Sequence, residues 1–239
     1  MNELRQLIQP WRHVFKLDPD RELGDNELDE ICRSGTDAIL VGGSTGVTYE
    51  NTTGLLSRLR RYELPCALEV SELEAAVPGF DLYMIPMVLN TSHTDWILGH
   101  HRKAIERFGS LIPWEALLTE GYIVLNENSS VARLTGADTG LSGRAAAAYA
   151  EIADKLMRLP VVYLEYSGTF GSMEVVREVR ESVEHSQLFY GGGITGEAEA
   201  EQAAALCDTV VVGNIIYRDV QQALLTIQAV KRTPKLVLE

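Results

Sequence analysis

Short runs of apolar residues alternate with longer amphipathic stretches along the chain. The apolar runs have the length of buried strands, and we predict strands at 13–18, 38–41, 66–71, 81–87, 120–126, 161–166, 187–191 and 209–213. Apolar residues recur at helical spacing between most of these runs, which predicts helices at 24–35, 51–63, 94–109, 142–157, 173–185, 197–206 and 219–231. This regular alternation is typical of a parallel α/β barrel.

One helix is missing from the alternation. Only Glu72 to Phe80 separate the third predicted strand from the fourth, and this segment contains Pro78-Gly79. A parallel crossover needs about a dozen residues. We therefore predict a single α/β domain over residues 1–239, a modified (β/α)8 TIM barrel whose third helix is missing or replaced by an extended segment. An open doubly wound sheet is the alternative, but its glycine-rich turn would follow the first strand.

Three further segments carry weaker patterns. Residues 127–141 are polar, which predicts a loop after the fifth strand, and residues 232–239 predict a tail that is not anchored to the domain. The apolar side chains around the helix at 94–109, among them Leu98 and Ile105, are most simply explained as core. They would also suit an apolar groove on the side where the missing third helix leaves the barrel wall thin.

Two predicted strands near the C-terminus end in glycine. Gly191, Gly192 and Gly193 close the seventh strand, and Gly213 and Asn214 follow the eighth. Backbone N–H groups without a neighbouring Cβ can approach an anion closely. In a (β/α)8 barrel, the loops after the seventh and eighth strands form a common phosphate site. A tight strand-to-helix turn explains the triple glycine alone equally well, but the pair of turns favours phosphate binding.

The first two strands end in residues suited to charged ligands. Lys16 and Asp18 are two apart in an extended segment, so their side chains point to the same side. We expect Lys16 to meet an anion and Asp18 to hold a divalent cation, since Mg²⁺ is bound through few carboxylates together with substrate phosphates. Ser44 could reach the same ion or a diphosphate oxygen. A buried salt bridge between Lys16 and Asp18 is the alternative.

The sixth strand supplies a candidate general base. Tyr163 and Glu165 share one face of this strand, and a carboxylate inside a barrel mouth is costly unless it is hydrogen-bonded. Glu165 could take a proton from a substrate hydroxyl, and Tyr163 could donate to a phosphate or a hydroxyl. An ion pair between Glu165 and Lys16 is compatible with these roles. A phosphate cradle beside a separate cation position indicates two phosphorylated substrates, or one with phosphates at both ends.

The overall composition limits the kinds of molecule that the protein is expected to bind. The formal net charge is −13 and no basic stripe is present, which argues against nucleic acid as a partner. The acidity also argues against tight electrostatic binding to anionic membranes, although not against a lipid substrate or transient lipid contact. Cys32, Cys66 and Cys207 lack metal-ligand spacing, and no signal peptide or membrane-spanning run is found, so we expect a cytoplasmic protein.

Several motifs together resemble one enzyme family, the bacterial heptaprenylglyceryl phosphate synthases, which are relatives of the archaeal geranylgeranylglyceryl phosphate synthases. The resemblance covers nearly the whole chain and lies in Phe15-Lys16-Leu17-Asp18-Pro19, Gly35-Thr36-Asp37, Arg133 to Thr139, Tyr163 to Gly168, Tyr190 to Ile194 and Val212-Gly213-Asn214. It implies a modified (β/α)8 barrel, usually a homodimer. Enzymes of this family use Mg²⁺ to transfer a long prenyl group from its diphosphate to the C3 hydroxyl of sn-glycerol 1-phosphate, which forms an ether lipid precursor.

The resemblance also implies roles for individual residues. Lys16 would contact glycerol 1-phosphate, and Asp18 and Ser44 would lie at the Mg²⁺, where relatives often have Thr in place of Ser44. In relatives that use the geranylgeranyl donor, a bulky side chain limits the length of the prenyl chain. Ala104 occupies the corresponding position here, so the small residue would leave room for a heptaprenyl chain. The remaining residues that would bind glycerol 1-phosphate are Tyr163, Leu164, Glu165, Tyr166, Ser167, Gly168, Gly193, Gly213 and Asn214.

Other functions stay open at this point. The same reaction with a shorter geranylgeranyl donor fits the same motifs. A phosphosugar isomerase or aldolase would share the phosphate cradle without a hydrophobic tunnel, but no Schiff-base lysine is evident beyond Lys16. A non-catalytic barrel that only binds metabolites or a protein partner is disfavoured, because Asp18, Ser44 and Glu165 converge with Lys16.

Overall fold

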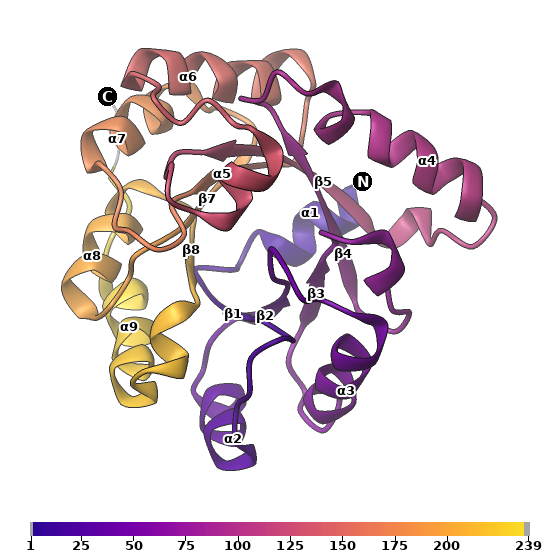
Figure 1. Ribbon diagram of the computed structural model, residues 1–239. Helices are drawn as coiled ribbons and strands as arrows, with labels where there is room; N and C mark the ends of the chain where they lie inside the picture. The colour runs from indigo at the N-terminus through magenta and orange to yellow at the C-terminus, as the bar shows by residue number, and fades with distance from the viewer. Residues whose placement is uncertain (1, 237–239) are drawn as a thin grey trace.

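The computed structural model describes residues 2–236 and shows eight parallel strands closed into a barrel in sequence order (Figure 1). The first and last strands close the wall through the parallel pairing of His13 with Val210. The predicted TIM barrel is therefore confirmed. The strands are β1 (His13–Leu17), β2 (Ala38–Val41), β3 (Cys66–Glu69), β4 (Leu82–Val88), β5 (Leu117–Val124), β6 (Val161–Glu165), β7 (Gln187–Gly191) and β8 (Thr209–Val212).

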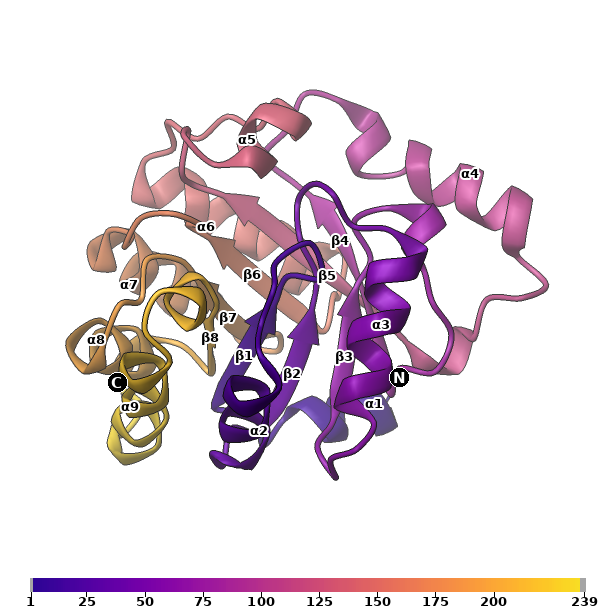
Figure 2. The same ribbon diagram turned by 60° about the horizontal axis from the view of Figure 1, so that its bottom comes forward.

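Helices cover the outside of most of the wall (Figures 1 and 2). They are α1 (Asn2–Ile8), α2 (Asp25–Arg33), α3 (Tyr49–Leu59), α4 (Gly99–Phe108), α5 (Ser130–Thr135), α6 (Gly143–Glu151), α7 (Met173–Ser182), α8 (Glu197–Leu206) and α9 (Val220–Arg232). In Figure 2 the strand arrows point upward and α1 lies at the lower end. Ile8 and Trp11 bury their side chains in the barrel interior, so the segment that begins with α1 closes the N-terminal end.

The third helix is absent, as predicted. Between β3 and β4 the described chain forms only a short 3-10 helix, Leu73–Ala75. Val77 and Phe80 are buried against the outer core and replace part of the missing helix. The wall beside β3 is consequently thinner than the wall elsewhere.

The strands bury both of their faces, as expected for a parallel sheet covered by helices. Val14, Leu40 and Tyr163 belong to the interior cluster, whereas their neighbours Phe15 and Ile39 belong to the layer between sheet and helices. This alternation sends Lys16 into the barrel together with Val14. All three cysteines are free thiols.

Several boundaries differ from the sequence-based expectation, and the segment from β5 to α5 differs in two ways. β5 begins at Leu117 and ends at Val124, because its pairing with β4 starts at Tyr83 opposite Leu117. The polar loop after β5 contains the short helix α5, whose first turn is capped by the Ser129 side chain and whose end is a left-handed Gly136 with φ of 63°. These caps satisfy backbone groups that a polar loop would leave to water.

The prediction that Leu98 and Ile105 are core is wrong. None of the side chains of α4 is buried, and Leu98 and Ile105 are 64% and 47% exposed. The helix lies beside the ends of β4 and β5 and does not pack flat on the sheet (Figure 1). Along residues 2–236 there is no helix with the length and apolarity that crossing a bilayer requires.

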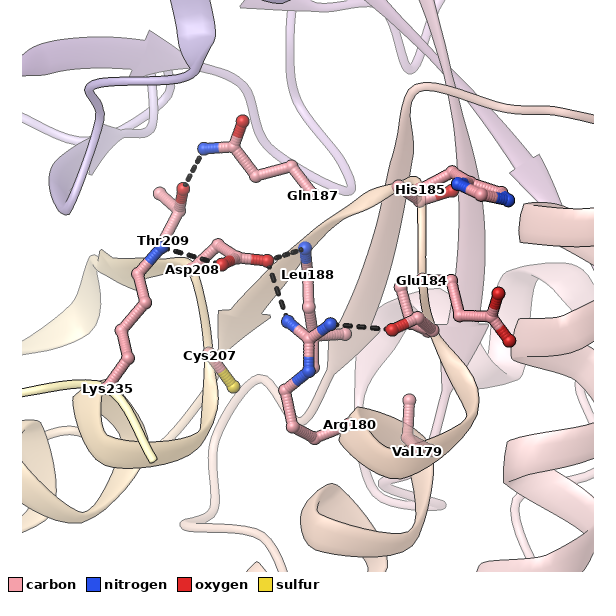
Figure 3. Close-up of polar contacts among 12 residues, drawn as sticks. Val179, Arg180, Glu184, His185, Gln187, Leu188, Cys207, Asp208, Thr209 and Lys235 are labelled. Carbon is pink, nitrogen blue, oxygen red and sulfur yellow. Dashed lines mark hydrogen bonds and ion pairs between the residues drawn. The ribbon is translucent and has the colours of Figure 1, made fainter. Parts of the chain in front are cut away.

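The prediction of an unanchored C-terminal tail is wrong over residues 233–236. Lys235 Nζ lies 2.7 Å from Asp208 Oδ1 (Figure 3). The Leu236 N–H donates to the Ala205 carbonyl at 2.7 Å. Asp208 also accepts hydrogen bonds from Arg180 and from the Leu188 N–H. A local sequence pattern does not reveal such an attachment, because the partners are far apart in the chain. Residues 237–239 lie outside the described residues.

Candidate active site

Most of the predicted site residues lie at one rim of the barrel. Glu165 is the last residue of β6, and Asp18, Ser44, Gly193 and Gly213 stand in the loops that follow four other strands. In a closed parallel barrel the carboxyl ends of all strands meet at the same rim, which is the upper end in Figure 2. Ala104 is separate from this group, on the half of the wall formed by β4 and α4.

Lys16 projects into the barrel and pairs with a residue that the sequence did not single out. Its Nζ lies 2.5 Å from Glu69 Oε2 and 5.7 Å from the centre of the Tyr163 ring. The direct ion pair that we considered between Lys16 and Glu165 is therefore replaced by one with Glu69. Burial alone would lower the pKa of Lys16, but the attraction of Glu69 and then of Glu165 outweighs it and raises the pKa. Lys16 is thus favoured as a cation in the barrel interior, below the rim.

Glu165 is held rigidly by two donors. Its Oε2 accepts a hydrogen bond from the Tyr122 hydroxyl at 2.6 Å, and its Oε1 accepts from the Ser167 N–H. The carboxylate is only 2% exposed. Tyr122 in turn stacks on Tyr163 with ring centres 4.7 Å apart. The two donors together fix the orientation of the carboxylate.

The glycines after β7 serve the packing of two loops. Gly193 has φ of +59°, and a Cβ there would overlap the backbone of Thr169 and Phe170 in the loop after β6. A Cβ at Gly191 would likewise overlap the Tyr163 hydroxyl. Within residues 2–236 the N–H groups of Gly193, Gly213 and Asn214 donate to no other backbone group. Tight packing and an anion cradle are therefore both compatible with this turn.

The Asp18 carboxylate packs closely against the backbone at Gly43. Its Oδ1 accepts from the Asp20 N–H at 3.0 Å, and a Cβ on Gly43 would come within 2.5 Å of the same oxygen. Burial first, and then the charge of Asp20, raise the pKa of Asp18 despite the hydrogen bond from the Asp20 N–H. A carboxylate whose charge is disfavoured in this way would be stabilised by a cation. The hydroxyl-bearing Ser44 directly follows Gly43.

Among residues 2–236, no group of three His, Cys, Asp or Glu side chains is placed to hold a metal ion. Mg²⁺ does not need such a group, because it keeps several waters and takes phosphate oxygens from substrates. The Asp18 carboxylate and the Ser44 hydroxyl are therefore oxygen donors that would fit a Mg²⁺ ion completed by waters and substrate phosphate.

Side-chain contacts that the sequence did not predict connect the first and last loops of the rim. The Arg21 guanidinium stacks 3.7 Å from the centre of the Tyr217 ring and donates to Asn214 Oδ1 at 3.0 Å. The Asp18 N–H donates to the Tyr217 hydroxyl at 2.7 Å. A cavity of about 380 Å³ opens beside these residues, lined also by Arg58.

Of the residues that the sequence did not single out, Glu69 could have been found, because it is a glutamate at the end of an apolar strand. Arg21 could not, because it lies in an ordinary polar loop.

Residues 6–231 match the PcrB family. The chain belongs to this family. It is 51% identical over 224 residues to a heptaprenylglyceryl phosphate synthase of Bacillus cereus (strain G9842), covering 94% of this chain and 98% of the relative. A heptaprenylglyceryl phosphate synthase of Geobacillus kaustophilus (strain HTA426) is 49% identical over 225 residues, covering 94% of each chain. The resemblance seen in the motifs is therefore confirmed.

Two solved structures share the fold of this PcrB-family chain. One is (S)-3-O-geranylgeranylglyceryl phosphate synthase from Thermoplasma acidophilum in complex with its substrate sn-glycerol-1-phosphate, with a TM-score of 0.83 and 23% identity over 97% of this chain and 96% of that one. The other is the wild-type GGGPS from Thermoplasma volcanium, with a TM-score of 0.83 and 24% identity over 98% of this chain and 99% of that one. At 23% and 24% identity, these similarities show a shared fold and nothing further.

Proposed function

We propose that this chain is a prenyltransferase that moves a heptaprenyl group from its diphosphate to the C3 hydroxyl of sn-glycerol 1-phosphate. The observation that carries the proposal is the buried Glu165 carboxylate, which Tyr122 and the Ser167 N–H hold at the rim that also carries Lys16. Membership of the PcrB family and the names of its relatives support the same reaction. They also set aside the isomerase or aldolase alternative.

Glycerol 1-phosphate would bind between the last three strands. The N–H groups of Gly193, Gly213 and Asn214 would donate to its phosphate, and the Lys16 ammonium would add an attractive charge. Tyr163, Leu164, Tyr166, Ser167 and Gly168 would form the rest of its pocket, since the loop after β6 lies against the glycine turn after β7. This arrangement directs the glycerol hydroxyl groups towards Glu165.

The chemical step then needs one proton acceptor. The C3 oxygen forms a bond to the first carbon of the prenyl chain while the bond from that carbon to the diphosphate breaks, and the electron pair leaves with the diphosphate. Glu165 takes the proton of the C3 hydroxyl. Fixed positions for the hydroxyl and the carboxylate supply much of the acceleration, because the reacting atoms need no further alignment.

Asp18 and Ser44 are the residues that would hold Mg²⁺. The ion, when bound, supplies positive charge that stabilises the departing diphosphate. The donor itself would extend over the thin wall beside β3 and β4 towards Ala104, where the small side chain leaves room for a long chain. We further propose that residues 1–239 act as one domain, that the protein is a cytoplasmic homodimer, and that its contact with membranes is transient.

A single assay tests the proposal. The protein is incubated with radiolabelled sn-glycerol 1-phosphate, Mg²⁺ and prenyl diphosphates of several lengths, and the products are extracted with butanol. We expect label in the organic phase, most of it with the heptaprenyl donor, and little with sn-glycerol 3-phosphate or after chelation of Mg²⁺. No organic label with any donor would contradict the proposed reaction, and equal label after chelation would contradict the metal.

A further inference from the structure

A layer of charged side chains lies in the barrel interior beneath the proposed site. Lys16, Glu69 and Glu120 come from β1, β3 and β5, and in such barrels alternate strands contribute the side chains of one layer. Glu69 is 5% exposed and Glu120 is fully buried. These layers are usually filled by branched apolar side chains, so two buried carboxyl groups need a physical reason.

The carboxyl groups differ in their hydrogen bonds. Glu69 Oε2 is paired with Lys16 Nζ, whereas Glu69 Oε1 has no partner among residues 2–236. Neither oxygen of Glu120 has a partner within the same residues. Glu165, by contrast, accepts from both of its donors. Among residues 2–236, the buried carboxyl oxygens that lack a hydrogen-bond partner therefore belong to Glu69 and Glu120.

The charge balance of this interior favours a proton on Glu120. One ammonium faces three carboxyl groups, and a buried carboxylate without a counter-charge takes up a proton. Burial raises the pKa of Glu120 well above its ordinary value, repulsion by Glu69 and Glu165 raises it further, and only Lys16 opposes the shift. Tyr122 and Tyr163, the other titratable groups that face this interior, have pKa values raised first by burial, so they are neutral donors.

We propose that Glu120 is a carboxylic acid in the folded protein and that it donates a hydrogen bond to Glu69 Oε1. This hydrogen bond would fix the orientation of Glu69, whose other oxygen holds the Lys16 ammonium below the rim. Glu120 is thus a positioning residue that acts on glycerol 1-phosphate through Glu69 and Lys16. This consequence rests on the proposed function, whereas the protonation of Glu120 does not.

Infrared difference spectroscopy tests the protonation without any substrate. At neutral pH the wild-type protein should show the C=O stretch of a protonated carboxyl group, and Glu120→Gln should lose it. Glu106→Gln, which changes a glutamate that is 65% exposed on α4, should leave the band intact. If the wild type has no such band, or if Glu120→Gln retains it, Glu120 is ionised and the inference is wrong whether or not the protein transfers prenyl groups.

Steady-state kinetics test the positioning role. Glu120→Gln keeps a neutral donor towards Glu69, whereas Glu120→Leu removes it at similar size. We expect the Gln variant to keep the wild-type KM for glycerol 1-phosphate, and the Leu variant to raise it about tenfold with a smaller effect on kcat, because Glu69 loses its donor. Equal KM values in both variants, or equal losses in both, would overturn the positioning role. If the Leu variant does not fold, the Gln variant decides: a wild-type KM there supports the positioning role, and a raised KM overturns it.

Discussion

Glu165 shows how a single residue of this interior is prepared for chemistry. Its two oxygens each accept one hydrogen bond, from Tyr122 and from the Ser167 N–H, so the carboxylate has one orientation and little water around it. The Tyr122 ring that supplies one of these bonds is itself fixed by stacking on Tyr163. The base would therefore meet a substrate hydroxyl without rearrangement, which is the condition for efficient proton transfer.

Replacing Glu165, the proposed base, gives the first prediction at the residue scale. Glu165→Gln preserves the shape of the side chain but cannot accept a proton, so we expect kcat to fall by a factor of about 10² or more. The butanol-extraction assay under saturating substrates measures the change. Glu174→Gln, on the exposed face of α7, is the control and should leave kcat unchanged. Wild-type turnover in the Glu165 variant would remove this residue from the role of base.

The second residue-scale prediction concerns Gly193. Alanine there would have to adopt φ near +59° and would overlap the loop at Thr169 and Phe170, so we expect a loss of about 1–3 kcal/mol in unfolding free energy. Gly54 is the matched control, because it lies inside α3 with nothing within 4 Å of an added Cβ. Gly54→Ala should instead stabilise the protein by about 1 kcal/mol. Urea unfolding measures both, and equal effects would contradict the steric argument.

At the scale of elements, one carboxylate ties together the lower ends of β7 and β8 and the segments around them. Asp208, just before β8, accepts from the Leu188 N–H at 2.8 Å and from Arg180 Nη1 at 2.9 Å, and it pairs with Lys235 at 2.7 Å (Figure 3). Arg180 also donates to the Val183 carbonyl. The last turn of α7, two strands and the C-terminal segment thus meet at a single side chain that is 18% exposed.

This junction gives a prediction with a defined pH dependence. Burial would raise the pKa of Asp208, but Lys235, the Leu188 N–H and Arg180 together lower it. The pairing therefore stabilises the fold fully above the unfolded pKa of about 4, and this stabilisation is lost as the pH falls through the lower folded pKa. Asp208→Asn should cost about 2–3 kcal/mol at pH 7 and progressively less below about pH 4.

Urea unfolding of Asp208→Asn at a series of pH values checks this expectation. Glu106→Gln is a suitable comparison, because it breaks an exposed pair with Arg102 on one helix, and such pairs contribute little to stability. A loss of stability in the Asp208 variant that stays constant from neutral to acidic pH would show that the carboxylate charge is not the cause.

At the scale of the whole molecule, the missing third helix decides where a long apolar substrate could lie. The wall beside β3 is covered by an extended segment with a short 3-10 helix, and α4 presents Leu98 and Ile105 to solvent on the same side of the barrel. Other parts of the wall are shielded by helices that pack their apolar faces on the sheet. In the proposed function, this is the side of the barrel along which the heptaprenyl chain would lie.

Ala104 on α4 provides the test of this arrangement. Ala104→Trp should lower kcat/KM for the heptaprenyl donor about tenfold or more and change that for the geranylgeranyl donor much less, because a bulky side chain shortens the groove. Lys103→Trp adds the same side chain at an exposed neighbouring position and should leave donor preference unchanged. If both variants shift the preference equally, or if neither does, Ala104 does not measure chain length.

The amino-acid sequence alone determined the alternation of strands and helices, the missing helix and the glycine turns, because hydrophobic periodicity and backbone freedom are local properties of the chain. It also brought Lys16, Asp18 and Glu165 to one rim, since the carboxyl ends of parallel strands must meet there. Only the tertiary structure decided that Lys16 pairs with Glu69, that Glu120 is fully buried in the barrel interior, and that Lys235 anchors the C-terminal segment. These contacts join residues far apart in sequence, and their strength depends on the burial that the closed barrel creates.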